Sequence, residues 1–346
     1  MKNKLGKTEL WSELKRVLLF SLPFFVLLLL YVIMDPFMVL YEYKDFNKNT
    51  YIHKNLDFIS TKKYMVNADS LSYDSFIFGG STALYISPKT WREYLGKEDE
   101  PYSFIASGEH INGIWSKIKY IHRSGADIKN TIIVLDTEGS FHEFINDNPI
   151  FMKHYKVFPS SALMFHYLTF TQFVNVRFLR ALVHYELSGN FHDYMGTYLV
   201  WKECYYDNIS NEYYNVGILE EIRNDSIGYY KRRPGSFVRN RLEKEHYISP
   251  QLNEEYVQKL KEIKRIFDEH RTEYKIIIGP NYYQKVFNKS DLVKIRAVFG
   301  DDNVFDFSGQ NHFSKEKSNF YDNVHFKKYV GDQLIDIVYS QNKDDK

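Results

Sequence analysis

The sequence predicts an α/β protein built around a doubly wound parallel sheet of five strands. Five short apolar runs have the length of buried strands, and segments with apolar residues at helical spacing lie between or after them. A chain of 346 residues, 44% of them hydrophobic, has enough material for such a core. The predicted strands are residues 75–78, 102–105, 131–135, 274–278 and 304–307.

One membrane-spanning helix is predicted before the sheet. Residues 17–34 are interrupted only by Ser21 and Pro23, and their length approaches the roughly 20 apolar residues that cross a hydrocarbon core. An uncleaved anchor is favoured over a signal peptide, because the run is longer than a typical signal core and Asp-Pro-Phe follows it instead of small residues.

The charges around residues 17–34 predict the orientation of the anchor. Asp35 follows the apolar run directly. Five basic residues precede the apolar run: Lys2, Lys4, Lys7, Lys15 and Arg16. The positive-inside rule then places residues 1–16 in the cytoplasm as a tail. The prediction is a single-pass protein of the cytoplasmic membrane whose domain is extracytoplasmic, or periplasmic.

The remaining chain divides into a stalk and one domain. Residues 35–72 are polar and rich in Tyr, Lys and Asn, which predicts a stalk with room for one short helix. Residues 73–340 form the predicted domain. Its helices are predicted at residues 110–122, 253–267 and 326–339, where apolar residues recur at helical spacing.

A long insertion separates the third and fourth predicted strands. Residues 140–250 are too many for a simple crossover, so they must form a substructure. Residues 165–185 are helical and aromatic in pattern, and residues 204–214 are a polar loop rich in tyrosine. The insertion is either a cap over a site at the sheet edge or a surface for a partner.

Composition excludes several classes of function. Basic and acidic residues number 45 and 44, so the chain lacks the positive charge of a nucleic-acid binder. Cys204 is the only cysteine, which excludes an internal disulfide and any multi-cysteine metal site. His110, His122 and His142 do not have a metal-binding spacing. The sequence therefore predicts no metal and no cofactor.

A Gly-Gly-Ser turn follows the first predicted strand. Gly79 and Gly80 let the backbone turn tightly and leave Ser81 exposed with its own N–H facing the site. Residue 83 is alanine, so this is not the Gly-x-Ser-x-Gly elbow of the α/β-hydrolases. Taken alone, the turn fits a nucleophile, a phosphate cradle or a purely structural bend.

A second candidate motif, Asp-x-x-His, precedes the last predicted helix. Asp322 and His325 can lie side by side, so that the carboxylate holds one imidazole nitrogen and the other faces a nucleophile. His325 could then take the proton of Ser81, which is a poor nucleophile until a base removes it. Taken alone, an Asp-x-x-His motif is better explained by an N-cap aspartate and a surface histidine.

Both motifs follow carboxyl ends of strands in one predicted sheet, and together they resemble the SGNH, or GDSL-like, hydrolase family. The resemblance covers about residues 73–140 and 274–339. It implies a flavodoxin-like sheet of SGNH type in which Ser81 is the nucleophile and Asp322 and His325 complete the triad. It also implies an oxyanion hole made by the N–H groups of Ser81 and Gly108, with Thr137 as a further contributor.

The stretch after the third strand departs from that family. The family has an asparagine there in a Gly-x-Asn-Asp block, whereas this chain reads Leu-Asp-Thr-Glu-Gly over residues 135–139. A carboxylate from Glu138 would repel a developing oxyanion unless it were protonated or turned away. Losing one donor costs about 10²- to 10³-fold in rate, which leaves weak hydrolysis or a degenerate site open. Asp136 fits ligand binding and turn capping equally.

The predicted anchor narrows the resemblance to membrane-tethered SGNH-like proteins that act in O-acylation of cell-surface polysaccharides, alginate acetylation and teichoic-acid D-alanylation proteins among them. It implies a serine acyltransferase or esterase for acyl esters, with acetyl the first candidate. It also implies a surface polysaccharide and a membrane-bound O-acyltransferase as partners. The alternative is a non-catalytic scaffold or glycan-binding component of a polysaccharide assembly complex, which Glu138 in place of asparagine favours.

Overall fold

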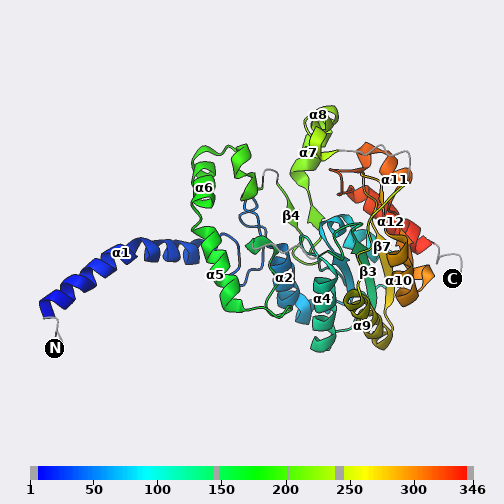
Figure 1. The fold of residues 1–346 in the computed structure, drawn as a ribbon, viewed down its shortest axis with the longest axis horizontal. Helices are drawn as coiled ribbons and strands as arrows, with labels where there is room; N and C mark the ends of the chain where they lie inside the picture. Colours follow the sequence, from blue (N-terminus) through cyan, green and yellow to red (C-terminus); the bar gives the residue numbers. More distant parts are fainter. Residues whose placement is uncertain (1–6, 143–147, 201–202, 238–244, 341–346) are drawn as a thin grey trace.

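A five-stranded, fully parallel sheet forms the centre of the protein. The computed structural model describes residues 7–142, 148–200, 203–237 and 245–340 (Figure 1). The strand order is β2-β1-β3-β7-β9, which is the doubly wound arrangement. The strands are β1 Ser75–Gly79, β2 Pro101–Ser103, β3 Asn130–Leu135, β7 Glu273–Ile278 and β9 Val304–Asp306.

These five strands confirm the predicted α/β class and the five predicted runs. Burial explains why the runs were readable in the sequence: every residue of β1, β2 and β3 is buried. Strands covered on both faces need continuous apolar side chains, and β-branched residues such as Ile132 and Ile133 suit the pleated surface.

Helices cover both faces of the sheet. One face carries α4 Ile111–Ser124, α9 Glu254–His270 and α10 Lys289–Phe299. The other carries α3 Pro88–Arg92 and α12 Lys328–Ser340. The helices predicted at 110–122, 253–267 and 326–339 are present with shifted ends, whereas α10 was not predicted. The domain also contains the short helix α11 His312–Lys315 and the paired strands β6 His246–Tyr247 and β8 Lys285–Val286.

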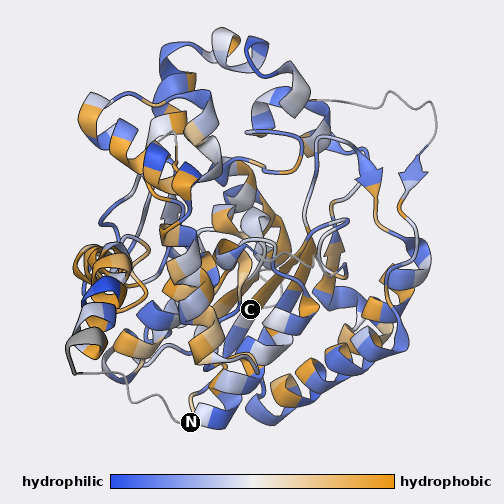
Figure 2. Cartoon of the chain, turned by 60° about the vertical axis from the view of Figure 1, so that its left-hand side comes forward, coloured by the Kyte–Doolittle hydropathy of each residue, from blue (hydrophilic) through white to orange (hydrophobic). Residues whose placement is uncertain are grey.

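The N-terminal helix α1, Lys7–Met34, contains the predicted span. From Leu10 to Met34 it is long and apolar enough to cross a membrane, as judged by length and composition. Figure 2 shows α1 and the strands of the sheet as the most hydrophobic parts of the ribbon. Lys2 and Lys4 of the predicted tail lie outside the described residues.

The segment after α1 folds back onto the domain. The Asp35 carboxylate accepts hydrogen bonds from the N–H groups of Val39 and Leu40, both at 2.9 Å, which closes the first turn. Helix α2, Leu56–Leu71, then lies within the stretch predicted as a stalk. Its Phe58 and Tyr64 are buried in two different apolar clusters, so this part of the chain belongs to the packed core.

The insertion is made of helices and one short hairpin. The helical pattern at 165–185 forms two helices, α5 Ala162–Phe173 and α6 Val176–Ser188, because the Asn175 side chain caps a new helix by accepting from two backbone N–H groups. The tyrosine-rich loop contains the hairpin of β4 Tyr205–Tyr206 and β5 Tyr213–Tyr214. Helices α7 Val216–Asn224 and α8 Ser226–Lys231 follow. Figure 1 places α5 and α6 on the side from which α1 projects.

Candidate active site

Two glycines shape the turn between β1 and Ser81. A Cβ atom on Gly79 would lie 2.7 Å from the carbonyl oxygen of Val134, and one on Gly80 would lie 2.9 Å from Oδ2 of Asp136. The contact with the Val134 backbone excludes a larger residue at Gly79, so this glycine lets β3 approach the turn. Ser81 then begins a 3-10 helix, η1 Ser81–Tyr85, at the carboxyl end of β1.

The histidine side of the site is a closed loop. The N–H of Tyr321 donates to the carbonyl oxygen of His325 at 2.8 Å. One oxygen of Asp322, Oδ1, accepts from the N–H groups of Val324 and His325 at 2.8 and 2.9 Å. The other oxygen, Oδ2, lies 2.7 Å from Nδ1 of His325. These bonds fix the orientation of the imidazole ring through Nδ1 and leave its second nitrogen, Nε2, on the side away from Asp322.

That second nitrogen meets Ser81. Nε2 of His325 lies 2.7 Å from Oγ of Ser81, although the two residues are 244 positions apart in the chain. The structure thus brings together all three residues that the sequence proposed for a triad. A serine, a histidine and an aspartate in this order and at these distances have the geometry that lets the imidazole remove the hydroxyl proton.

Electrostatics favour an ionised aspartate beside a basic imidazole. Burial lowers the pKa of His325, but the hydrogen bond and charge of Asp322, together with the charge of Asp136, outweigh it and raise that pKa above its usual value. Burial also opposes ionisation of Asp322, yet bonds to His325 and to two backbone N–H groups lower its pKa. An ionised Asp322 holds the proton of the neutral ring on Nδ1 and leaves Nε2 as the acceptor for serine.

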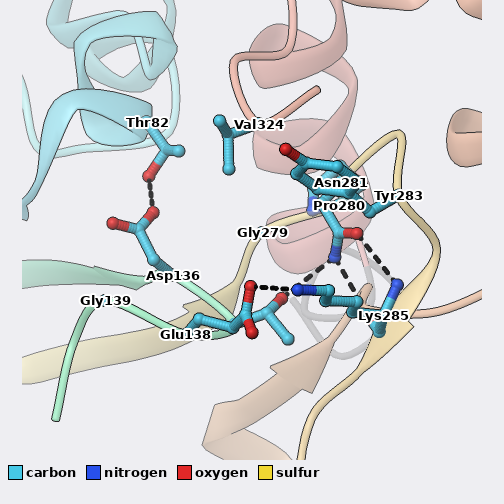
Figure 3. Close-up of a pocket in the computed structure, with 11 residues that line it drawn as sticks. Thr82, Asp136, Glu138, Gly139, Gly279, Pro280, Asn281, Tyr283, Lys285 and Val324 are labelled. Atoms are coloured by element: carbon cyan, nitrogen blue, oxygen red, sulfur yellow. Dashed lines mark hydrogen bonds and ion pairs between the residues drawn. The ribbon is translucent and has the colours of Figure 1, made fainter. Parts of the chain in front are cut away.

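Asp136 is the site residue that the sequence left undecided. It follows β3, and its Oδ1 accepts from the Thr82 hydroxyl (Figure 3). Its Oδ2 lies against Gly80, so Asp136 contacts the neighbours of Ser81 on both sides. Burial raises its pKa, partly offset by the Thr82 hydrogen bond and the charge of His325. The sequence signal for this contact was the position of Asp136 at the carboxyl end of β3, the strand next to β1.

The N–H groups expected to form an oxyanion hole are available. Among the described residues, no protein acceptor takes the N–H of Ser81 or of Gly108. Gly108 is exposed and has a φ of 57°, a left-handed conformation that glycine adopts at little cost. Thr137 is buried on the wall of a cavity, and its hydroxyl oxygen accepts from Nδ2 of Asn281 at 3.0 Å.

Among the described residues on that wall, Asn281 carries an amide side chain, and it is hydrogen-bonded within the protein. Its Nδ2 donates both to Thr137 and to the carbonyl oxygen of Lys285, at 3.0 and 3.1 Å. Glu138, which the sequence marked as a repulsive group, forms a 2.7 Å ion pair with Lys285 (Figure 3). The charge of Glu138 is therefore balanced by a cation. Asp136 is the carboxyl group that lies next to the turn of Gly80, Ser81 and Thr82.

A buried ionic cluster supports the loop that carries Gly108. Nζ of Lys117 lies 2.6 Å from Glu109 and 3.1 Å from Asp57, and Lys153 contacts the same two carboxylates. Burial would raise the pKa of Asp57, but the two lysines lower it. The cluster ties the loop after β2 to α2, α4 and the insertion. The sequence did not indicate it, because its members are scattered along the chain.

Two cavities are lined in part by the loops that carry the candidate site. One of about 130 Å³ is lined by Thr82, Asp136, Thr137, Asn281, Tyr283 and Val324, among others. The second, of about 330 Å³, lies next to the Gly108 loop. Its walls include Ser107 from that loop, Phe151, Cys204 and Tyr213 from the insertion, and Lys54 from the segment before α2.

No family model matches the chain, and no curated protein matches it. Fold and site alone therefore define the class: an α/β protein with a doubly wound parallel sheet and a Ser-His-Asp constellation at the carboxyl edge. Among the residues that the structure describes, no group of three or more His, Cys, Asp or Glu side chains is placed to hold a metal ion.

Proposed function

We propose that this chain is an SGNH-like serine acyltransferase or esterase that acts on acyl esters of a cell-surface polysaccharide. The observation that carries the proposal is the pair of 2.7 Å hydrogen bonds that joins Ser81 to His325 and His325 to Asp322. A scaffold has no need of a serine hydroxyl aligned with a base that is itself oriented by a carboxylate.

The proposed chemistry proceeds through an acyl-enzyme. Oγ of Ser81 attacks the acyl carbonyl while Nε2 of His325 takes the hydroxyl proton and Asp322 stabilises the imidazolium. The N–H groups of Ser81 and Gly108 donate to the oxyanion. The C–O bond to the leaving alcohol then breaks, and His325 returns the proton to that alcohol. An incoming hydroxyl reverses these steps: a sugar hydroxyl makes the reaction a transfer, and water makes it hydrolysis.

One further observation supports the location. Helix α1 supports a single-pass anchor in the cytoplasmic membrane at residues 17–34, with the domain outside. The choice of a small acyl group such as acetyl rests on the resemblance to SGNH-like proteins, because the described residues that line the cavity beside Thr82 do not include Ser81 or His325. A membrane-bound O-acyltransferase is the proposed partner that delivers the acyl group.

The test is covalent trapping of the serine in the full chain, purified in detergent. A fluorophosphonate reacts only with activated serines, and the intact mass reports the adduct. We expect one adduct on the wild type and on the control Ser70→Ala, whose serine is exposed on α2. Ser81→Ala and His325→Ala should show none. An adduct that persists in folded Ser81→Ala would refute the proposal.

A non-catalytic component of a polysaccharide assembly complex is the second candidate. It is favoured by the loop after β3, which supplies Asp136 and Glu138 where the family has an amide donor. No adduct on a folded wild type, together with binding of acetylated glycan that Ser81→Ala leaves unchanged, would establish this candidate in place of the first.

A further inference from the structure

Helix α5 packs directly against the apolar helix α1. Phe170 of α5 lies edge-on to Phe24, with ring centroids 5.8 Å apart, and to Tyr31 at 5.4 Å. Phe173 also contacts Tyr31, at 5.3 Å. Helix α5 reads ALMFHYLTFTQF and carries no Asp, Glu, Lys or Arg. The insertion thus touches the proposed membrane span through an uncharged aromatic helix.

The depth of this contact follows from helix geometry. Phe24 lies 34 − 24 = 10 residues before Met34, the last residue of α1. At about 1.5 Å per residue this is about 15 Å along the helix axis, or half of a hydrocarbon core about 30 Å thick. If α1 spans the bilayer, as proposed above, a side chain that packs on Phe24 lies at the depth of the lipid acyl chains.

The outer face of α5 and one stripe of α6 expose apolar side chains, and α6 also exposes Arg177 and Arg180. Leu163 on α5 is 82% exposed, and Val176 and Leu187 on α6 are 78% and 84% exposed. Val176, Val183 and Leu187 recur at helical spacing and form one stripe, opposite the buried Phe178 and Leu182. Both helices lie on the side of the molecule from which α1 projects (Figure 1). An exposed apolar patch beside a membrane span marks a surface for lipid or for a partner.

We propose that α5 and the apolar stripe of α6 form a second membrane contact, inserted among the lipid acyl chains of the outer leaflet beside α1, with Arg177 and Arg180 reaching the headgroups. Lipid is the occupant that fits best, because the patch continues directly from the proposed span and α5 offers no charge for a protein partner to pair with. The domain would then be held at two points. That arrangement fixes the orientation of its catalytic edge relative to the bilayer, which a single flexible anchor would not do.

The test measures the depth of single labels on the full chain. Cys204→Ser removes the native thiol, and an environment-sensitive fluorophore is attached to a cysteine at Leu163 or Leu187. The protein is reconstituted into vesicles of equal parts phosphatidylcholine and phosphatidylglycerol, with or without bromine on the acyl chains. Bromine quenches only labels that reach the acyl chains. Ile227→Cys on α8, which is 83% exposed, is the matched control, and Phe20→Cys on α1 reports the anchor.

We expect brominated lipid to quench the labels at 163, 187 and 20 and to leave the label at 227 unchanged. Quenching at 20 with none at 163 and 187 would overturn this inference and leave the anchor in place. Because the vesicles contain no other protein, the exposed patch would then be assigned to a protein partner that is missing from the experiment. No quenching at 20 would overturn the anchor and the inference together. Neither result bears on Ser81, so failure here is distinguishable from failure of the proposed chemistry.

Discussion

The two sides of the candidate site are held in place by different kinds of contact. On the histidine side, Asp322 bonds to the side chain and the N–H of His325, three residues later, so the motif is largely self-supporting. On the serine side, Asp136 and Glu109 come from other elements, and each contacts partners distant in the sequence. The histidine side of the site is therefore a local motif, whereas the serine side depends on the assembled fold.

The largest effect should come from breaking the local side. Asp322→Asn keeps an acceptor for the backbone N–H groups but favours the wrong tautomer of His325. We expect turnover of an acyl ester such as p-nitrophenyl acetate to fall about 10⁴-fold in a folded protein, as loss of the orienting carboxylate does in serine triads. The control is Asp301→Asn, whose side chain is 84% exposed. Equal rates for the two variants would exclude a catalytic triad.

Removing Glu109 tests the long-range side. Glu109→Ala leaves Lys117 and Lys153 buried with Asp57 as their only carboxylate in the cluster. Breaking a buried pair costs about 3–5 kcal/mol in the free energy of unfolding, because a desolvated charge is left uncompensated. Chemical denaturation of the full chain in detergent measures this change.

The matched control for Glu109 is an exposed carboxylate. Glu269 pairs with Arg265 on the surface of α9, and both side chains are about half exposed. Glu269→Ala should lower the free energy of unfolding by less than about 1 kcal/mol. If both substitutions have the same small effect, the cluster does not support the Gly108 loop.

Gly331→Ala tests the packing between the histidine side and the serine side of the site. A Cβ atom there would lie 1.9 Å from the carbonyl oxygen of Tyr85, so α12, which follows His325, must move away from the turn that begins at Ser81. Gly331→Ala should cost about 1–3 kcal/mol of stability through overpacking and should lower ester turnover as well. Gly235→Ala is the control, because no heavy atom lies within 4 Å of its added Cβ. A stable, fully active Gly331→Ala would contradict the close packing.

The smallest expected effect is electrostatic. The charge of Asp136 helps to raise the pKa of His325, and the reaction needs the neutral imidazole. Asp136→Asn removes that charge, so the pKa of His325 falls and the acidic limb of the kcat/KM profile moves to lower pH. Asp306→Asn, at the end of the outer strand β9, should leave the profile unchanged. An acidic limb that stays in place or moves to higher pH would show that Asp136 does not act on His325.

Features that depend on neighbours in the chain were readable from the sequence. The five strands were located because their apolar runs are continuous, and the Gly-Gly-Ser turn and the Asp-x-x-His motif each rely on residues next to one another. Helix α10 was missed, as was the break at Asn175 that divides the helical pattern of the insertion into α5 and α6. In both cases the helix begins at an asparagine cap, a local signal that the apolar pattern alone does not include.

The sequence by itself determined the class of fold, the apolar helix and the identity of the three residues at the edge of the sheet. Only the tertiary structure decided that Asp136, and not Glu138, lies beside the serine turn, that Glu109 belongs to a buried ionic cluster, and that α5 contacts α1. The physical reason is that hydrophobic periodicity and hydrogen bonds within a turn act over a few residues. Ion pairs and ring contacts between distant segments exist only after the sheet has assembled and brought their strands and helices together.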